Sequence, residues 1–459
     1  MRVWKTSGGA CVEQRPGLYP GARGHRRKHT VSDVTVIGAG ISGLSCAWTL
    51  KKLGIDAVVL EAGSRAGGVI RTEKINGYQV EAGPNSFQAA APALQLVDEA
   101  GLWDDLMPPA PNAPRFVYWN GKLRRFPFGP LTISGIARVL REPFVASESP
   151  VDESVRDFFV RRVGRQAHDR LVAPALTGIY AGDTANLSMA AVFPKILAME
   201  REHGSLTRAF LKSLRSRPKP GELTRAKPKG SVFSFPDGVE TLPKRLADQL
   251  NIKYNVAGAR IGDAPVTVLT VPAYKAVELL LDRQTALGTL LQKIQYAPMV
   301  IAAVSLPDHS FNAPLHGFGF LAPRNQGLHL LGALFSSALF PDRAPKGQEL
   351  LTCFVGGMFE PDAIDWPDER VWDVVCTEIK SALRTSQMPQ PVALFRQPHA
   401  IPQYNIGDER WVSAVKAELN SVPGLFITAN YLEGVSVPAC IDQSNRTARA
   451  VAEYLGRKV

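Results

Sequence analysis

The sequence predicts an α/β protein whose first domain contains a parallel sheet. A short apolar run, Asp33–Ile37, leads directly into a glycine-rich turn, Gly38–Gly43, and then into a helical stretch, Leu44–Leu53. A second apolar run, Asp56–Leu60, ends at the acidic residue Glu61. Strand, turn, helix and strand in this order form a βαβ unit, the building block of parallel sheets.

The glycine-rich turn has the G-x-G-x-x-G spacing of Rossmann-like dinucleotide-binding domains. Gly38 permits a tight turn, Gly40 lets the backbone approach a pyrophosphate, and Gly43 lets helix and strand pack closely. The helix that follows presents free N–H groups to an anion. The predicted contacts in this turn are Gly38, Gly40, Ile41, Ser42 and Gly43. A glycine-rich turn without a ligand is the alternative.

The segment after the second strand favours a flavin over a nicotinamide. Glu61, 18 residues after Gly43, can accept hydrogen bonds from a ribose diol and would repel a 2′-phosphate. Gly67 and Gly68 follow it, with Arg65 close by, and provide a second close backbone approach near positive charge. A nicotinamide site does not need this second approach. The arrangement resembles the second flavin motif of the amine oxidase-like flavoproteins, so FAD is the predicted cofactor.

The end of the chain carries a second strand-turn-helix pattern. Gly424–Asn430 is strand-like, Tyr431–Val437 is a turn, and Ala439–Leu455 is helical. In the flavoproteins that it resembles, this unit returns to the first domain and covers the flavin, which makes that domain discontinuous. The contacts predicted here are Asn430, Gly434, Val435, Ser436 and Val437.

Several further segments narrow the resemblance. They are Glu81–Phe87, Pro114–Leu123, Gly178–Asp183 with Leu187–Ser188, Phe335–Pro345 and Gly434–Val437. In this order they resemble the oxygen-dependent, FAD-containing protoporphyrinogen oxidases, in the bacterial and plastid-like branch that also contains the coproporphyrinogen III oxidases. The resemblance covers about residues 33–456. It adds four predicted cofactor contacts, Gly83, Pro84, Asn85 and Ser86.

The resemblance implies an oxidoreductase of heme biosynthesis that acts on CH–CH type donors. Protoporphyrinogen IX would lose six electrons, two at a time, to FAD, and O2 would reoxidise the flavin and become H2O2. Coproporphyrinogen III, oxidised by the same chemistry, is the first alternative. Another amine oxidase-like flavoprotein, acting on an amine or a polyene, is the second. A non-catalytic scaffold on this fold is the third.

The substrate is a largely apolar macrocycle with carboxylate arms, so we expect an apolar pocket with a few cations. The resemblance assigns Arg115 to a substrate carboxylate, which a guanidinium can bind through two parallel hydrogen bonds. It assigns Leu321, Leu334 and Phe354 to the apolar pocket wall, and Ala181 and Gly182 to a turn of small residues beside the macrocycle. From composition alone, a surface arginine and ordinary core residues are the plainer interpretation. We nominate no general base, and the eight histidines show no metal-ligand spacing.

The resemblance also divides the chain into domains. The FAD-binding domain comprises 31–95, 232–272 and 396–459, and the substrate domain comprises 96–130, 207–231 and 273–395. Residues 131–206 form a helical domain, which lies on a membrane in the family. The stretch 251–265 is some twenty residues shorter than usual, and part of that region normally contacts the adenine.

Charge and composition restrict location and partners. The net charge of +11 lies in residues 1–30 and 204–230, not across a folded surface, so no nucleic-acid partner is expected. The five scattered cysteines fit a reducing compartment, and no apolar stretch approaches the roughly 20 residues of a membrane span. We expect a cytoplasmic protein, with peripheral membrane contact, a homodimer and hand-over to a ferrochelatase left open. Residues 1–30 are a disordered tail or, alternatively, an organellar targeting segment.

Overall fold

The computed structural model describes residues 32–147, 152–215, 228, 230–257, 261–262, 264–280, 285–311 and 313–457. The predicted tail at 1–30 and part of the basic stretch at 204–230 lie outside these residues.

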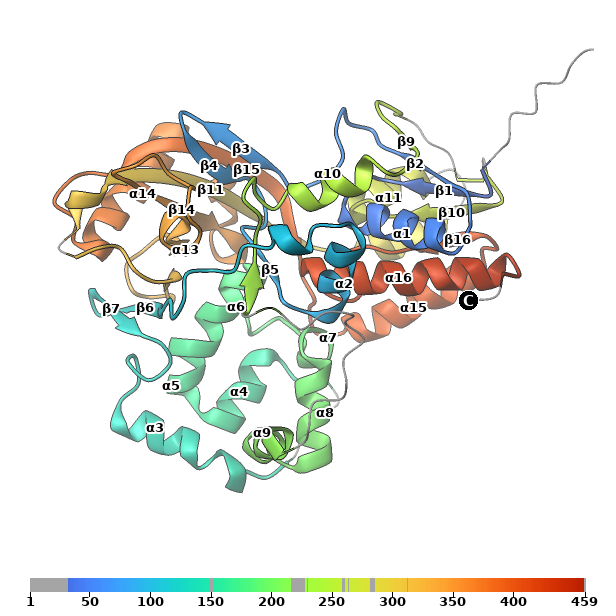
Figure 1. Ribbon diagram of the computed structural model, residues 1–459. Coiled ribbons are helices and arrows are strands. Elements are labelled where there is room, and N and C mark those ends of the chain that lie inside the picture. Colours follow the sequence, from blue (N-terminus) through green and yellow to red (C-terminus); the bar gives the residue numbers. More distant parts are fainter. Residues whose placement is uncertain are drawn as a thin grey trace, which may run out of the picture. The chain divides into compact units, whose positions relative to one another are not determined.

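A five-stranded parallel sheet joins strands from three separate parts of the chain (Figure 1). Its order is β16 (Leu425–Ile427), β10 (Val266–Leu269), β1 (Val34–Ile37), β2 (Ala57–Leu60) and β9 (Ile252–Lys253). All four residues of β1 and all four of β10 are buried, as expected for parallel strands covered on both faces. The predicted α/β class with a Rossmann-like sheet is confirmed.

Helices cover both faces of this sheet. One face packs against α1 (Ile41–Lys52), α2 (Ala91–Glu99), α10 (Thr241–Ala247) and α16 (Val437–Tyr454). The other face packs against α11 (Ala273–Leu280), α12 (Thr285–Leu291) and α15 (Asp408–Asn420). The sequence predicts that a segment of the substrate domain begins at residue 273. In the structure α11 and α12, which lie in that segment, instead bury their apolar sides on the parallel sheet of the FAD-binding domain. The other domain boundaries stay a prediction.

A second sheet of seven strands forms a separate layer. Its order is β15 (Gln390–Pro402), β11 (Tyr296–Pro307), β14 (Gln348–Gly356), β13 (Leu330–Leu334), β12 (Gly319–Leu321), β6 (Arg115–Trp119) and β7 (Lys122–Arg125). Along β11 the side chains alternate between two clusters. Val300 packs with α14 (Asp368–Leu383), whereas Met299 and Ile301 belong to a different cluster with Leu331. Because strand side chains have a period of two, β11 contributes to both faces of the sheet.

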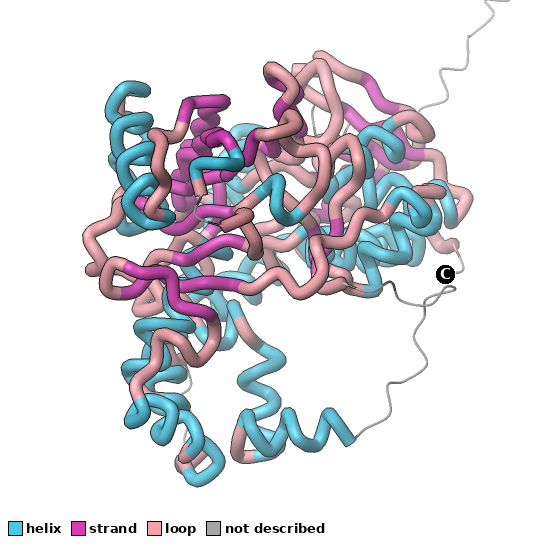
Figure 2. Tube along the Cα trace, turned by 60° about the vertical axis from the view of Figure 1, so that its left-hand side comes forward, coloured by secondary structure: helices cyan, strands magenta, loops and turns pink. Residues whose placement is uncertain are grey.

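The third part is helical. Figures 1 and 2 both show its helices grouped together on one side of the two sheets. They are α3 (Ile133–Leu140), α4 (Val155–Val163), α5 (Arg165–Ala167), α6 (Ala173–Tyr180), α7 (Met189–Val192), α8 (Pro194–His203) and α9 (Leu206–Arg215). A π-helical turn, His168–Val172, joins α5 to α6. No helix in the described part of the chain is long and apolar enough to cross a membrane.

Short elements complete the fold. β3 (Thr72–Ile75) pairs with β4 (Tyr78–Glu81), and β5 (Phe87–Gln88) pairs with β8 (Val232–Phe233). A short helix, α13 (Ser336–Leu339), follows β13. Single helical turns of the 3-10 type lie at Trp103–Asp105, Glu142–Phe144, Asp308–Ser310, Gly357–Phe359 and Pro361–Asp365.

Candidate functional site

A cavity of about 580 Å³ brings together residues from all three parts of the fold. Its walls come from the second sheet, from α6, from the segment 82–88 and from the start of α16. Four of the six predicted substrate residues line it, namely Arg115, Leu321, Leu334 and Phe354. Seven of the predicted cofactor residues line it as well: Gly83, Pro84, Asn85, Ser86, Val435, Ser436 and Val437.

The sheet supplies the apolar wall. Leu321, Leu334 and Phe354 come from the neighbouring strands β12, β13 and β14, whose pairing sets them side by side. β12 and β13 approach so closely at Gly319 that a β-carbon there would lie 2.1 Å from the Ala333 oxygen. Gly319 therefore has a packing role, and its φ of +135° also favours glycine.

Helix α6 supplies a second wall through Thr177, Gly178 and Ile179. Gly178 permits close contact with the sheet, because a β-carbon on it would lie 2.9 Å from the Leu321 side chain. The helix ends at Ala181, which has a φ of +50° and is fully buried.

The predicted contacts of Ala181 and Gly182 with substrate do not agree with this arrangement. Neither residue lines the cavity among the described residues. A β-carbon on Gly182 would lie 2.2 Å from Oε1 of Gln403, and the Ala181 oxygen accepts a hydrogen bond from the Met358 nitrogen at 2.8 Å. The small size of these residues lets the end of α6 pack tightly, so they support the wall from behind.

Arg115 stands at the exposed edge of the cavity, at the start of β6. Its guanidinium carbon lies 4.5 Å from the centroid of the Phe318 ring. Arg115 is the single charged residue among the lining residues that the structure describes. The cavity is therefore an apolar space with one cation at its edge, which suits a largely apolar ligand that carries carboxylate groups.

The predicted nucleotide turn has the hydrogen bonds of a preformed cradle. Glu61 accepts hydrogen bonds from the backbone nitrogens of Ala39, at 2.7 Å, and Gly63, at 2.8 Å. The Gly67 nitrogen donates to the Ala39 oxygen at 2.8 Å, and a β-bridge joins Gly40 to Gly67. The two glycine motifs, predicted separately, thus form one surface.

The turn leaves room for a ligand next to Gly40. A β-carbon on Gly40 would meet no described protein atom within 4 Å, whereas one on Gly43 would lie 1.9 Å from the Gly38 oxygen. Gly40 is thus open toward a ligand and Gly43 is needed for packing. The α1 N-terminus begins at Gly40 without a side-chain cap, which leaves its N–H groups available to a phosphate. These residues fit the pyrophosphate of FAD.

Arg65 makes hydrogen bonds and an ion pair within the protein. Its Nη2 donates to the Gly68 oxygen at 2.6 Å, and its Nη1 donates to the Ala66 oxygen and pairs with Glu240 at 3.3 Å. Arg65 therefore shapes the second glycine loop. A direct contact with the cofactor stays a prediction.

The shortened stretch after α10 still reaches the acidic residue. The Glu61 nitrogen donates to the Lys253 oxygen at 2.9 Å, and the Val256 nitrogen donates to the Glu61 oxygen at 2.9 Å. Residues 252–256 thus lie beside the predicted ribose position. The missing length does not separate this segment from the nucleotide surface.

Several residues of the cavity are not among those predicted from the sequence. Met299, Ile301, Phe318, Ile179 and Gln397 line the cavity but were not predicted to do so. The period of two along β11 could have indicated Met299 and Ile301, because Ile301 pairs with Phe354. Gln397 reaches the cavity through the pairing of β15 with β11, in which it lies opposite Met299.

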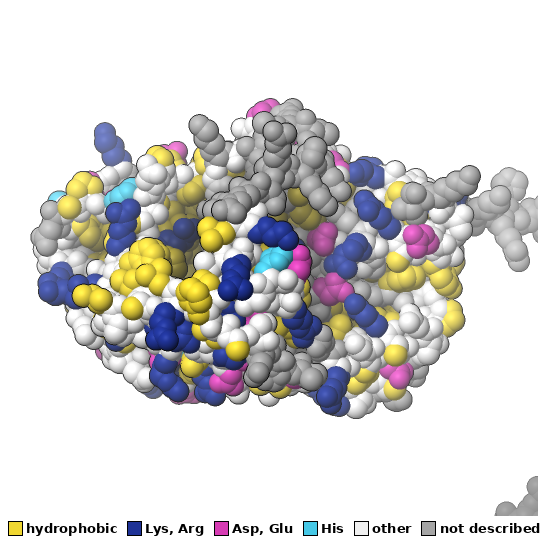
Figure 3. Space-filling model, turned by 90° about the horizontal axis from the view of Figure 1, so that it is seen from below, with side chains coloured by type: hydrophobic (Ala, Val, Ile, Leu, Met, Phe, Trp, Pro, Cys, Tyr) yellow, Lys and Arg dark blue, Asp and Glu magenta, His cyan; other side chains and the backbone are white. Residues whose placement is uncertain are grey.

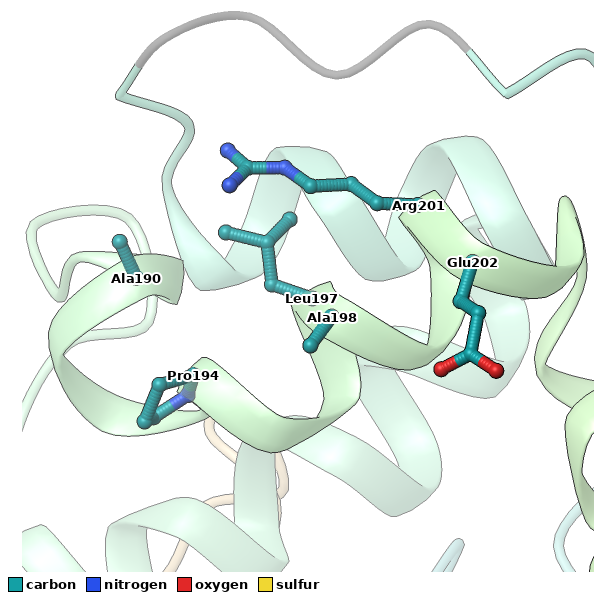
Figure 4. A pocket seen from close by; sticks show the side chains of 6 residues that line it. All are labelled: Ala190, Pro194, Leu197, Ala198, Arg201 and Glu202. Carbon is teal, nitrogen blue, oxygen red and sulfur yellow. The ribbon is translucent and has the colours of Figure 1, made fainter.

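A second hollow, of about 420 Å³, lies in the helical part (Figure 4). Its lining consists of Ala190, Pro194, Leu197, Ala198, Arg201 and Glu202. All six residues belong to the neighbouring helices α7 and α8. It is a groove beside one pair of helices and contains none of the predicted site residues, so the larger cavity is the candidate site.

Comparisons with known proteins agree with this geometry. The family model described as flavin containing amine oxidoreductase matches residues 41–452. The chain is 34% identical to the chloroplastic protoporphyrinogen oxidase of Nicotiana tabacum, over 93% of this chain and 86% of that protein. It is 28% identical to the coproporphyrinogen III oxidase of Bacillus subtilis (strain 168), over 94% of this chain and 99% of that protein.

The fold also matches solved structures. A crystal structure from Exiguobacterium sp. 255-15, provisionally named a protoporphyrinogen oxidase, has a TM-score of 0.76 and 22% identity. The match covers 92% of this chain and 98% of that chain. At this identity the likeness concerns the fold alone.

Proposed function

Because this chain belongs to the flavin-containing amine oxidoreductase family, we propose that it oxidises protoporphyrinogen IX to protoporphyrin IX, with O2 as the electron acceptor and release of H2O2. The chain is an FAD-dependent oxidoreductase. Relatives that cover nearly its whole length are named protoporphyrinogen oxidases and coproporphyrinogen III oxidases. These names support porphyrinogen oxidation in heme biosynthesis as the function.

The observation that carries the choice of substrate is the single charge of the cavity. Arg115 is the one charged residue in its described lining, and the other walls are mainly apolar. Protoporphyrinogen IX has two neighbouring propionates and two vinyl arms, whereas coproporphyrinogen III has four propionates. Burying a carboxylate against an apolar wall without a cation costs several kcal/mol of desolvation free energy, on the order of the penalty for an unpaired buried charge. One cation at the cavity edge therefore favours protoporphyrinogen IX.

The chain contributes binding and orientation. Arg115 would hold a propionate at the edge, while Leu321, Leu334 and Phe354 enclose the macrocycle and exclude water. Bound FAD supplies the chemistry that the side chains lack, namely acceptance of a hydride equivalent and reoxidation by O2. The described lining contains no Asp, Glu, His, Lys or Cys. The proton lost in each two-electron step then goes to water or to another pyrrole nitrogen of the substrate.

The test is turnover of both porphyrinogens in parallel. The purified protein is incubated in air with protoporphyrinogen IX or coproporphyrinogen III, and porphyrin fluorescence and H2O2 are followed. We expect a larger kcat/KM with protoporphyrinogen IX. A preference for coproporphyrinogen III would overturn the choice of substrate, and bound FAD without turnover of either would overturn the porphyrinogen assignment in favour of an amine or polyene oxidase. Protein without bound FAD would favour the scaffold alternative.

Peripheral contact of the helical part with a membrane is a further component of the proposal. Ile133 is 88% exposed and Phe144 is 83% exposed, and Leu140 and Phe210 are exposed as well. Exposed Arg141 adjoins this group. Figure 3 shows hydrophobic side chains gathered among Lys and Arg side chains on the face seen from below. Apolar side chains ringed by cations are typical of surfaces that lie on anionic lipid.

Sedimentation with vesicles that contain phosphatidylserine tests this contact. We expect Ile133→Ser with Phe144→Ser to reduce the bound fraction several-fold, whereas Met388→Ser, at an exposed apolar residue elsewhere, leaves it unchanged. Equal binding of both variants would remove the membrane component. The proposal also includes a homodimer, which analytical sedimentation tests, and hand-over of the product to a ferrochelatase, which a coupled assay tests. It places the protein in the cytoplasm and not in an organelle, which cell fractionation tests.

A further inference from the structure

Two adjacent buried residues directly after β15 contact two different walls of the cavity. Gln403 is 4% exposed and Tyr404 is 3% exposed. Neither lines the cavity, and neither is a predicted site residue. Their hydrogen bonds nevertheless end on segments that do line it.

Gln403 holds the C-terminal end of α6. Its Nε2 donates to the Tyr180 oxygen at 2.8 Å and to the Ile401 oxygen at 3.0 Å. Its backbone nitrogen donates to the Gln295 oxygen at 2.9 Å, which ties the residue to the second sheet. Since the preceding turn of α6 presents Thr177, Gly178 and Ile179 to the cavity, Gln403 determines how far that wall stands from the sheet.

Tyr404 holds the turn that precedes α16. Its hydroxyl donates to the Asn430 oxygen and accepts from the Gly434 nitrogen at 2.8 Å. One oxygen thus closes both ends of the turn 430–434, immediately before the cavity-lining residues 435–438. Burial raises the pKa of the Tyr404 phenol well above its usual range, which keeps the proton needed for the donated bond.

The two residues are linked through Tyr180. The ring of Tyr404 packs edge-on against the ring of Tyr180, with 6.1 Å between centroids, while Gln403 binds the Tyr180 carbonyl. The peptide from Gln403 to Tyr404 is therefore a short rigid link between α6 and the 430–434 turn. A buried, hydrogen-bonded group of this kind has few alternative arrangements.

We propose that Gln403 and Tyr404 are positioning residues that set the α6 wall and the flavin-facing turn at a fixed distance from each other. Tyr404 places the residues before α16 against the cofactor, and Gln403 places α6 against the substrate. The inference rests on the proposed function only for the identity of that substrate. Its main tests need no porphyrinogen, so the two can fail separately.

The first test is Tyr404→Phe, which keeps the ring and removes both hydrogen bonds. We expect the apo-protein to bind FAD about tenfold more weakly, because a buried carbonyl and N–H lose their partner. We also expect a changed flavin absorption spectrum and a shifted flavin reduction potential. The matched control is Tyr431→Phe in the same turn, since the buried Tyr431 hydroxyl has no hydrogen-bond partner among the described residues. If Tyr404→Phe and Tyr431→Phe have the same FAD affinity, spectrum and potential, the proposal is wrong.

The second test is Gln403→Met, which keeps the length of the side chain and removes its donor. We expect faster amide hydrogen exchange in residues 173–182 and a several-fold higher KM for the porphyrinogen, with FAD affinity close to wild type. Tyr404→Phe should have the opposite effects, namely weaker FAD binding and little change of amide hydrogen exchange in α6. Thermal unfolding of each apo-protein identifies a variant that has merely lost its fold. Unchanged exchange in a folded Gln403→Met variant would contradict the role given to Gln403.

Discussion

The guanidinium of Arg115 lies over the face of the Phe318 ring, with 4.5 Å between the guanidinium carbon and the ring centroid. Phe318 stands between Gly317 and Gly319, whose φ angles of +140° and +135° allow the chain to turn the ring under the arginine. A ring face attracts a cation and leaves the edge donors of the guanidinium free. Arg115 is thereby oriented toward the cavity before a carboxylate arrives.

Replacing Arg115 should therefore impair substrate binding more than chemistry. We expect Arg115→Ala to raise KM for protoporphyrinogen IX by about tenfold to a hundredfold, with a smaller change in kcat, because a charged hydrogen bond of about 1.5–3 kcal/mol is lost. Arg115→Lys should restore only part of this, since an ammonium cannot form the paired bonds. Steady-state kinetics measures both effects, with Arg124→Lys on exposed β7 as the control. A wild-type KM in Arg115→Ala would show that another group binds the propionates.

The glycines at 40 and 43 should respond differently to the same substitution. Gly40→Ala adds a methyl group where no described protein atom lies within 4 Å, so we expect an apo-protein of wild-type stability that binds FAD at least tenfold more weakly. Gly43→Ala would place its methyl group 1.9 Å from the Gly38 oxygen, so we expect the apo-protein itself to be destabilised. Thermal unfolding without FAD, together with FAD titration, separates the two. Normal FAD binding by Gly40→Ala would move the pyrophosphate away from this turn.

Glu61 should support FAD binding in two ways, by accepting hydrogen bonds from the ribose and by holding the glycine turn in place. Its carboxylate accepts from the Ala39 nitrogen at 2.7 Å and so supports the glycine turn even before a ribose binds. We expect Glu61→Gln, which keeps the acceptor oxygen, to weaken FAD binding less than Glu61→Ala, which removes it. Titration of apo-protein with FAD measures the order. Equal affinity in all three proteins would exclude a ribose contact.

The stability of the helical part should fall in acid through Glu142. Burial disfavours the Glu142 carboxylate, but hydrogen bonds from Ser205, Thr207 and Leu206 outweigh it and lower its pKa from 4.5 to about 2. The carboxylate also pairs with buried Arg162. Because the pKa is lower in the folded state, this stabilisation is complete above about pH 4.5 and is lost as the pH falls toward 2.

Glu142→Gln tests that dependence. It should remove about 1–3 kcal/mol at neutral pH, because buried donors lose their carboxylate acceptor, and it should flatten the stability curve between pH 4.5 and 2 relative to wild type. Denaturant unfolding at several pH values measures the difference, and Glu369→Gln on the exposed face of α14 should leave the curve unchanged. Parallel curves for wild type and Glu142→Gln would contradict the assignment.

The parts of the site that could be predicted are those with a local chemical signature. Gly40, Glu61 and Gly67 come together because βαβ geometry brings the first strand, the turn after it and the end of the second strand to one edge. Arg115 and the strand residues Leu321, Leu334 and Phe354 came from the resemblance. Ala181 and Gly182 did not follow the prediction, because the left-handed end of α6 turns them into the protein.

The sequence by itself determined the nucleotide-binding class, because the strand, glycine turn, helix and acidic residue that define it are near neighbours in the chain. The flavin and the apolar substrate wall were implied by a resemblance that several separate segments carry. Only the tertiary structure decided that Gln403 and Tyr404 join α6 to the 430–434 turn, that Phe318 orients Arg115, and that Arg115 is the one charge in the described cavity lining. These relationships link residues far apart in the sequence, and they follow from how the strands pair and the helices pack, which no local pattern encodes.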